Sequence, residues 1–388
     1  MNARHYGTIG AREVMWWAVA SFLGLGRLTF PREFVTSSGM GAAYAFALMC
    51  ALTYGSTLLI VFVMRHFPGQ SAIDVAVMSL GWVGRVFESL MGAIMTLILA
   101  ETYRLFAFML HESMLQHTPA WVILALAAIA AAYGTKAGVE AVSRSLQLLT
   151  PLFLVIAIVG FIPAYWGVRL TFLIPHWAGW RPELLGTYRG VFILSGLQNV
   201  FIFAGFARPH GFRKSVIAGI TVDLAVLALV FAATVGSFGV DTLPLVSWPG
   251  ALIARAVDLH GFYIERIGYV SMIAVTGAVI LFLIQTTLTS AIAITQILAL
   301  KPRAYPTVGY ALVALSAGGA LLIPNVTVAE AIAVTLVSPL TLFMLLLKPV
   351  VLWVASAVSL KKAGGGDTPS ASWRRRGEPR PALRGTAR

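Results

Sequence analysis

Apolar runs long enough to cross a membrane recur along this chain of 388 residues. A helix needs roughly 20 mainly apolar residues to cross a bilayer. The apolar runs and the polar breaks between them predict an all-α integral membrane protein with about ten transmembrane helices, which we call spans one to ten. They cover residues 12–37, 41–65, 86–112, 120–135, 143–166, 187–208, 215–240, 265–299, 304–323 and 328–357.

The composition excludes a water-soluble globule. Hydrophobic residues make up 59% of the chain and charged residues only 11%, whereas ordinary soluble domains are about a quarter charged. The formal net charge of +13 comes from basic residues in short loops and in the tail after Ser359. That placement is typical of membrane topology, so we expect no nucleic-acid partner.

Lys and Arg are concentrated in one alternating set of loops, which includes Arg65, Lys136, Arg144 and Lys301. Cytoplasmic loops carry such an excess, so we expect that face, and both termini, to be cytoplasmic. Residues 1–360 are predicted to form one transmembrane domain, and residues 361–388, rich in Gly, Pro, Ser and Arg, a disordered basic cytoplasmic tail. The apolar run after the polar N-terminus has no small-residue cleavage site, so we expect span one to be retained.

Two spans carry residues that interrupt a helix. Span one holds Gly24, Gly26, Arg27 and a proline, and span six holds Gly205 followed by Pro209. A continuous lipid-facing helix does not tolerate this combination. Interrupted helices at matching positions of two five-helix halves indicate an inverted-repeat transporter with its substrate site at the breaks. The alternative is that these glycines only allow close helix packing.

An unwound helix exposes backbone N–H groups at the start of its second half, where the helix dipole favours a carboxylate. Arg27 lies beside the first break, and an arginine inside a membrane is expected to face a cavity or to pair with an acid. Glu101 is expected to contribute to a ligand or proton site in span three. Alternatively, it neutralises Arg104, three residues further along the same helix.

Nothing in the sequence indicates a metal, a cofactor or enzymatic chemistry. The single cysteine, Cys50, lies within an apolar run, and the histidines at span ends and in loops show no metal-ligand spacing. No nucleophile, base and orienting group recur at a usable spacing. We therefore predict a protein without catalytic activity.

Short motifs carry a resemblance to a known family, and the strongest is Gly-X-Glu-X-X-X-Arg at Gly138, Glu140 and Arg144. Over roughly residues 9–358 the chain resembles the endospore germination permeases, the B-type membrane subunits of nutrient germinant receptors in the amino acid–polyamine–organocation transporter superfamily. The motifs are residues 65–70 (RHFPGQ), 80–84 (LGWVG), 118–121 (TPAW), 132–144 (AYGTKAGVEAVSR), 149–151 (LTP), 173–175 (LIP), 179–182 (GWRP) and 264–267 (IERI).

The resemblance implies a permease-like domain of two inverted five-helix repeats, with helices one and six broken and a nutrient pocket between spans one, three, six and eight. It also implies A-type and lipoprotein C-type partner subunits and the inner membrane of the spore. Many members keep an acidic residue just after the span-six glycine, where this chain has Phe206 and Ala207, which favours an apolar pocket. The substrate-binding residues carried over are Gly24, Leu25, Gly26, Arg27, Glu101, Phe203, Ala204, Gly205, Phe206 and Thr287.

The function expected from this resemblance is that of a membrane subunit of a spore nutrient germinant receptor. It binds a small germinant, an amino acid of about the size of alanine, valine or leucine, and triggers germination through its partner subunits. The alternative is an active amino acid permease coupled to a proton or sodium gradient, because the same broken-helix architecture supports both outcomes.

Overall fold

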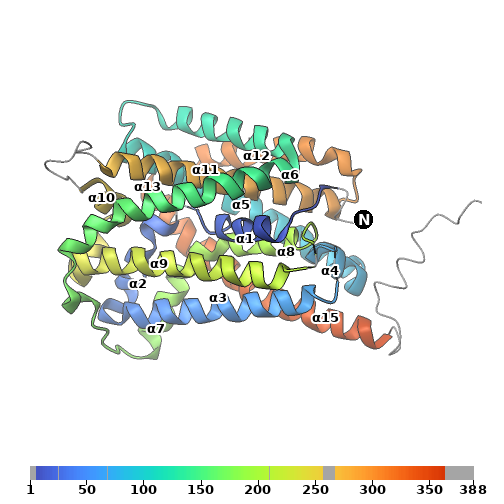
Figure 1. The fold of residues 1–388 in the computed structure, drawn as a ribbon, viewed down its shortest axis with the longest axis horizontal. Coiled ribbons are helices and arrows are strands. Elements are labelled where there is room, and N and C mark those ends of the chain that lie inside the picture. The colour runs from blue at the N-terminus through green and yellow to red at the C-terminus, as the bar shows by residue number, and fades with distance from the viewer. Residues whose placement is uncertain (1–5, 25, 68, 209, 257–266, 363–388) are drawn as a thin grey trace, which may run out of the picture.

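The computed structural model describes residues 6–24, 26–67, 69–208, 210–256 and 267–362. Within these residues the chain is almost entirely helical, and the one β-bridge joins Ile9 to Ala207. Figure 1 shows long helices running side by side, with the N-terminal stretch, α4 and the end of α15 toward one end and α7 and α10 toward the other. Of the predicted basic tail, Lys361 and Lys362 form the end of α15, and residues 363–388 lie outside the described residues.

The first half of the chain contains α1 (Ala11–Ala20), α2 (Gly26–Ser38), α3 (Ala42–Met64), α4 (Ala72–Leu80), α5 (Trp82–Ser113) and α6 (Ala120–Phe161). The second half contains α7 (Trp180–Gly190), the 3-10 helix η5 (Val191–Leu197), α8 (Gln198–Phe203), α9 (Phe212–Thr242), α10 (Pro249–Ala256), α11 (Ile267–Ile297), α12 (Tyr305–Leu321), α13 (Val326–Ile332), α14 (Ser338–Leu342) and α15 (Lys348–Lys362). Shorter 3-10 turns, including η3 (Ile162–Gly167), join some of them.

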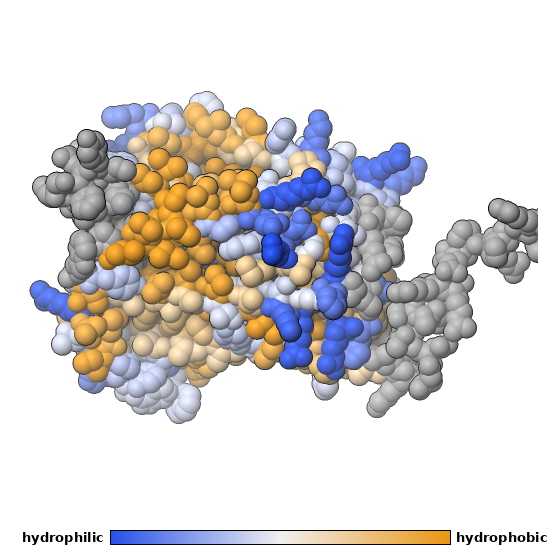
Figure 2. All heavy atoms as spheres, in the orientation of Figure 1, coloured by the Kyte–Doolittle hydropathy of each residue, from blue (hydrophilic) through white to orange (hydrophobic). Residues whose placement is uncertain are grey.

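All ten predicted spans have helical counterparts in the part of the chain that the structure describes. Seven helical stretches there are long and apolar enough to cross a membrane. These seven stretches contain eight of the predicted spans, two to five and seven to ten. Spans four and five share one stretch. Spans one and six are absent as continuous helices because each is divided into shorter pieces. Figure 2 shows broad hydrophobic surface on the visible face, with strongly hydrophilic residues mostly toward one end.

Span one divides at Ser21, where α1 ends, and α2 begins at Gly26. The N–H groups of Phe22 and Leu23 bond to carbonyls three residues back, so the last turn of α1 tightens before the chain leaves the helix. The proline of span one, Pro31, lies inside α2, so the interruption lies at the glycines rather than at the proline.

The interruption of span six lies earlier than the sequence indicated. The predicted break was at residues 203–206, where α8 does end, but the departure from α-helix that meets span one is η5, between α7 and α8. Residues 203–206 form the end of α8 and the turn that follows it. Hydropathy missed η5 because its sequence, VFILSGL, is almost uniformly apolar.

Close helix packing surrounds the two broken spans. Spans four and five form one helical element, α6, whose direction changes at Gly138 with φ 86°, a backbone conformation that glycine adopts without strain. α6 packs along α11, and glycines allow their close approach. A side chain at Gly134 would meet Ile284, and one at Gly277 would meet the ring of Phe153.

A buried ion pair ties span ten to span three. Lys348, at the start of α15, places its Nζ 2.9 Å from Glu88 Oε2 on α5, and the two side chains are 4% and 2% exposed. The same Nζ lies 4.8 Å from the ring centre of Phe201 on α8. Removing one member of such a pair leaves an uncompensated charge, whereas replacing both with apolar groups is often close to neutral.

We expect Lys348→Met to lower the thermal unfolding temperature of the purified chain, because an unpaired buried Glu88 costs about 3–5 kcal/mol. The double variant Lys348→Met/Glu88→Leu should recover most of that loss. Thermal unfolding in detergent micelles measures both. If the double variant is as unstable as the single one, the loss does not come from the uncompensated charge of Glu88, and this explanation is wrong.

Candidate functional site

The end of α1 is held by a side chain from α11. Gln285 Nε2 donates to the Trp17 carbonyl at 3.0 Å and to Ser21 Oγ at 2.7 Å, and Ser21 Oγ donates to the same carbonyl at 2.8 Å. Gln285 therefore binds the carbonyl and the hydroxyl at the point where the helix stops. Because all three residues are fully buried, these bonds replace those that water would supply.

The interruption of span six lies against the interruption of span one. A Cβ at Gly196, in η5, would overlap the carbonyl oxygen of Ser21, and a Cβ at Gly190 would overlap the ring of Phe34. Glycine at both places allows this close approach. Immediately after η5, Asn199 binds α11: its Nδ2 donates to Thr286 Oγ1 at 3.0 Å and its Oδ1 accepts from Thr289 Oγ1 at 2.7 Å.

A small cavity of about 20 Å³ lies between the two interruptions, α5 and α11. This volume is enough for about one water molecule. Its walls come from spans one, three, six and eight, and the lining residues are Gly24, Glu101, Thr102, Leu105, Phe192, Ile193, Ser195 and Phe282. We call this cavity the central pocket.

Among the described residues, Glu101 is the one charged residue in the lining of the central pocket. Its side chain is buried, Oε2 accepts from Thr102 Oγ1 at 3.4 Å, and Oε1 has no hydrogen-bond partner in the part of the chain that the structure describes. Burying an ionised carboxylate without a cation costs several kcal/mol. The pocket therefore has an incomplete polar site, which a ligand carrying a cationic group would complete.

Arg104 does not neutralise Glu101. Its Nε donates to the Ile323 carbonyl at 2.6 Å, and its guanidinium lies 4.2 Å from the ring centre of Phe108. The two side chains form no ion pair with each other. The alternative of a structural Glu101–Arg104 pair is therefore wrong in this structure, because the arginine turns to the loop between α12 and α13.

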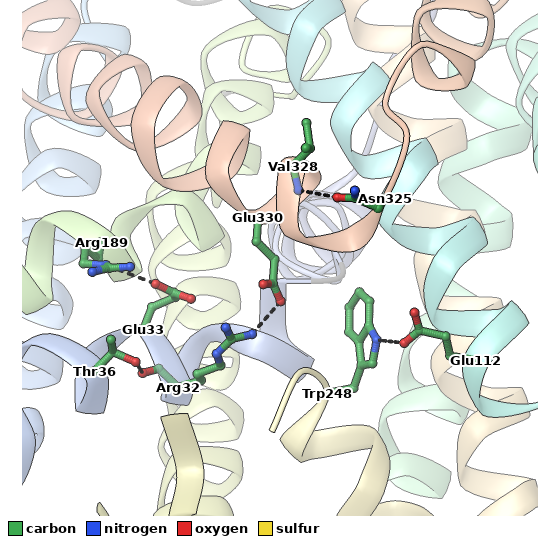
Figure 3. Close-up of polar contacts among 9 residues, drawn as sticks. All are labelled: Arg32, Glu33, Thr36, Glu112, Arg189, Trp248, Asn325, Val328 and Glu330. Carbon is green, nitrogen blue, oxygen red and sulfur yellow. Dashed lines mark hydrogen bonds and ion pairs between the residues drawn. The ribbon is translucent and has the colours of Figure 1, made fainter. Parts of the chain in front are cut away.

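Ionic contacts join the elements where α2 leads away from the pocket (Figure 3). Arg32 Nη1 lies 2.7 Å from Glu330 Oε1 on α13, and Glu33 Oε2 lies 3.2 Å from Arg189 Nε on α7. Figure 3 shows the neighbouring residues Arg32 and Glu33 turned to different partners. The second half of span one is thereby tied to both span six and span ten. Arg32, an arginine inside a membrane span, is thus neutralised by an acid, Glu330.

The structure brings together two of the predicted substrate-binding residues, Gly24 and Glu101, in the central pocket. Thr287 is fully buried beside Tyr103 and does not line it. Gly26 begins α2. Leu25 and the side chain of Arg27 lie outside what the structure describes.

The predicted residues at the end of span six lie elsewhere. The ring of Phe203 packs edge-on against Trp17 at 5.7 Å, and the Phe206 carbonyl accepts from the N–H of Ile9 at 3.0 Å. Ala204 and Gly205 lie between them in the turn after α8. This segment contacts Trp17 of α1 and the stretch that precedes α1, and none of its residues lines the central pocket.

Sequence reasoning missed the pocket residues of η5 and α11, which include Phe192, Ser195 and Phe282. Gly190, just before η5, and Gly196, within it, were the available signal, because two glycines six positions apart mark the segment that must approach span one. The ring of Phe282 lies 3.4 Å from the position that a Cβ at Gly24 would take, so it forms the wall behind the first break.

Comparison with known proteins assigns the family. A family model described as "Spore germination protein" matches residues 8–325. The chain belongs to the spore germination protein family. Its relatives in Bacillus subtilis (strain 168) include Spore germination protein B2, 23% identical over 155 residues, which are 39% of this chain and 42% of that protein. Spore germination protein YndE is 20% identical over 248 residues, which are 63% of this chain and 68% of that protein.

Solved structures show that this spore germination protein has a transporter fold. MhsT in complex with L-phenylalanine superimposes with a TM-score of 0.61 at 16% identity, covering 88% of this chain and 97% of that one. A Na+-coupled sialic acid symporter in its substrate-bound outward-open state gives 0.58 at 12% identity, covering 95% and 86%. The predicted all-α fold of inverted repeats is confirmed. The family match supports a germination-related membrane protein rather than an enzyme.

We expect Gly196→Ala to destabilise the chain, because the added methyl group would overlap the Ser21 backbone, which has no flexible end to move aside. Overpacking of this kind costs typically about 1–3 kcal/mol, which corresponds to a loss on the order of 5 °C in thermal unfolding temperature. The control is Gly318→Ala in α12, where nothing lies within 4 Å of the added Cβ. Equal effects of the two substitutions would contradict the contact between the breaks.

Proposed function

We propose that this chain is the membrane subunit of a spore nutrient germinant receptor and that it binds a small amino acid in the central pocket. The observation that carries the proposal is the buried, unpaired Glu101 in a cavity between the two breaks of a spore germination protein. Proposed with it are the inner membrane of the spore as its location, cytoplasmic termini, and partner subunits of the A type and the lipoprotein C type.

An amino acid matches the chemistry of the central pocket. Its ammonium group supplies the cation that Glu101 lacks, as a charge-assisted hydrogen bond. Its carboxylate complements the backbone N–H groups at the start of α2, which have no partners within the helix. The remaining walls, formed by Leu105, Phe192, Ile193 and Phe282, favour an apolar side chain.

Ligand binding requires a change of conformation. The central pocket, at about 20 Å³, is smaller than any amino acid, so the ligand must prefer a state in which the breaks have moved apart. Differential affinity for two states is the condition under which a ligand can shift a conformational equilibrium. The pairs Arg32–Glu330 and Glu33–Arg189 link the moving half of span one to spans ten and six, so their rearrangement offers a route to partner subunits.

Thermal unfolding of the purified chain tests this function. We expect one or more of L-alanine, L-valine and L-leucine to raise the unfolding temperature, because a ligand of the folded state stabilises it. Glu101→Gln should lower the affinity for that amino acid by roughly tenfold or more, since a hydrogen bond to a charged group contributes about 1.5–3 kcal/mol.

The matched control is Glu112→Gln on the same helix, where the carboxylate accepts from Trp248 Nε1 at 2.7 Å and does not line the pocket. This variant should respond to the amino acid as the wild type does. A wild-type chain stabilised by no amino acid, or a Glu101→Gln variant with the full response, would refute the proposed site.

An active amino acid permease coupled to a proton or sodium gradient is the second candidate. It is favoured by the transporter fold of both structural neighbours, one of them a Na+-coupled symporter. Uptake of the stabilising amino acid into proteoliposomes separates the two functions. Gradient-driven accumulation that Glu101→Gln abolishes supports the permease, and binding without accumulation supports the receptor.

A further inference from the structure

A second and larger cavity lies behind the break of span one, with a volume of about 160 Å³. Gly24 borders this cavity as well as the central pocket, so the two lie on opposite sides of the same backbone. Its walls come from the break, α6, η3, α9 and α11, and include Leu154, Ala157, Phe161, Val226, Val230 and Ala278.

The helix packing explains why the cavity exists. α6 packs along α11, and α9 packs along α1, but α6 and α9 contact each other only sparsely. The gap between α6 and α9 therefore stays open, and Leu23 and Gly24 at the break of span one form its inner wall. Both helices lie on the visible face of Figure 1, and Figure 2 shows that this region of the surface is predominantly hydrophobic.

The cavity opens toward the hydrocarbon of the bilayer. Its rim residues Ile162 and Leu229 are 50% and 44% exposed, whereas the wall residues Leu154 and Val230 are 8% and 7% exposed. Val226 and Val230 lie near the middle of a helix long enough to span the membrane. The cavity is thus continuous with the lipid-facing surface of the protein.

The chemistry of the lining excludes water as the occupant. The one polar side chain among the described lining residues is that of Tyr165, and its hydroxyl already donates to the Leu229 carbonyl at 2.6 Å. An apolar cavity of about 150 Å³ in another protein stays dry and binds benzene, whereas a buried water needs two to four polar partners. A cavity of similar size that opens into a bilayer has hydrocarbon as its natural occupant.

We propose that this cavity is a binding site for one acyl chain of a bilayer phospholipid, which enters between α6 and α9 and packs against the backbone of Leu23 and Gly24. The acyl chain fills the space behind the break of span one, on the side opposite the central pocket. This proposal does not depend on the germinant or on the receptor function, because it concerns the apolar cavity and the lipid alone.

Photo-crosslinking tests the site. The full chain is reconstituted into nanodiscs of phosphatidylcholine and phosphatidylglycerol, with part of the phosphatidylcholine carrying a diazirine in the middle of one acyl chain. Mass spectrometry then locates the adducts after illumination. Leu315 on α12, which is 68% exposed, reports contact with bulk lipid. We expect adducts on the buried walls, at Leu154 and Val230, as well as at Leu315.

Filling the cavity provides the control. Ala278→Trp from α11, or Ala157→Phe from α6 if the first variant does not fold, should abolish the adducts at Leu154 and Val230 and leave that at Leu315. The wild-type pattern is decisive by itself: labelling at Leu315 without labelling at the buried walls overturns the proposal. Wall adducts that persist in a folded, filled variant overturn it as well.

Discussion

The contact between the two helix interruptions is the constraint on which the rest of the structure depends. Gly196 lies so close to the Ser21 carbonyl that no side chain fits between them, and Gln285 from span eight holds the same turn. Once these segments meet, span three and span eight can close the remaining sides. The central pocket is thus formed by backbone that has left the helix, which a membrane protein tolerates only inside the protein.

The partners of the buried charged residues distinguish those with a structural role from the one that we assign to the ligand site. Lys348 and Glu88 compensate each other in a fully buried pair, and Arg104 is bound by the carbonyl of Ile323. Glu101 is different, because it is equally buried and forms no ion pair with any residue that the structure describes. A membrane protein keeps an uncompensated carboxylate at a cost in stability, and such residues commonly mark ligand or ion sites.

The sequence alone predicted the number of spans, the fold class and the first break, because hydropathy and the run of glycines and arginines around Gly24 are local signals. The second break was misplaced for a physical reason. η5 is apolar throughout, and what makes it irregular is its approach to span one, a tertiary contact. The same limit applies to Glu101. Three-residue spacing left Arg104 open as an alternative partner, but the carbonyl that binds Arg104 comes from a loop more than two hundred residues away.

Hydrogen–deuterium exchange of the purified chain, with and without a mixture of L-alanine, L-valine and L-leucine at millimolar concentration, tests the central claim most directly. A ligand held between the two breaks should slow exchange in peptides covering residues 21–26 and 191–197. It should leave residues 203–208 unchanged, because that turn lies against the N-terminal stretch. Slower exchange confined to residues 203–208, or no change in either interruption when the ligand is bound, would contradict a site between the breaks.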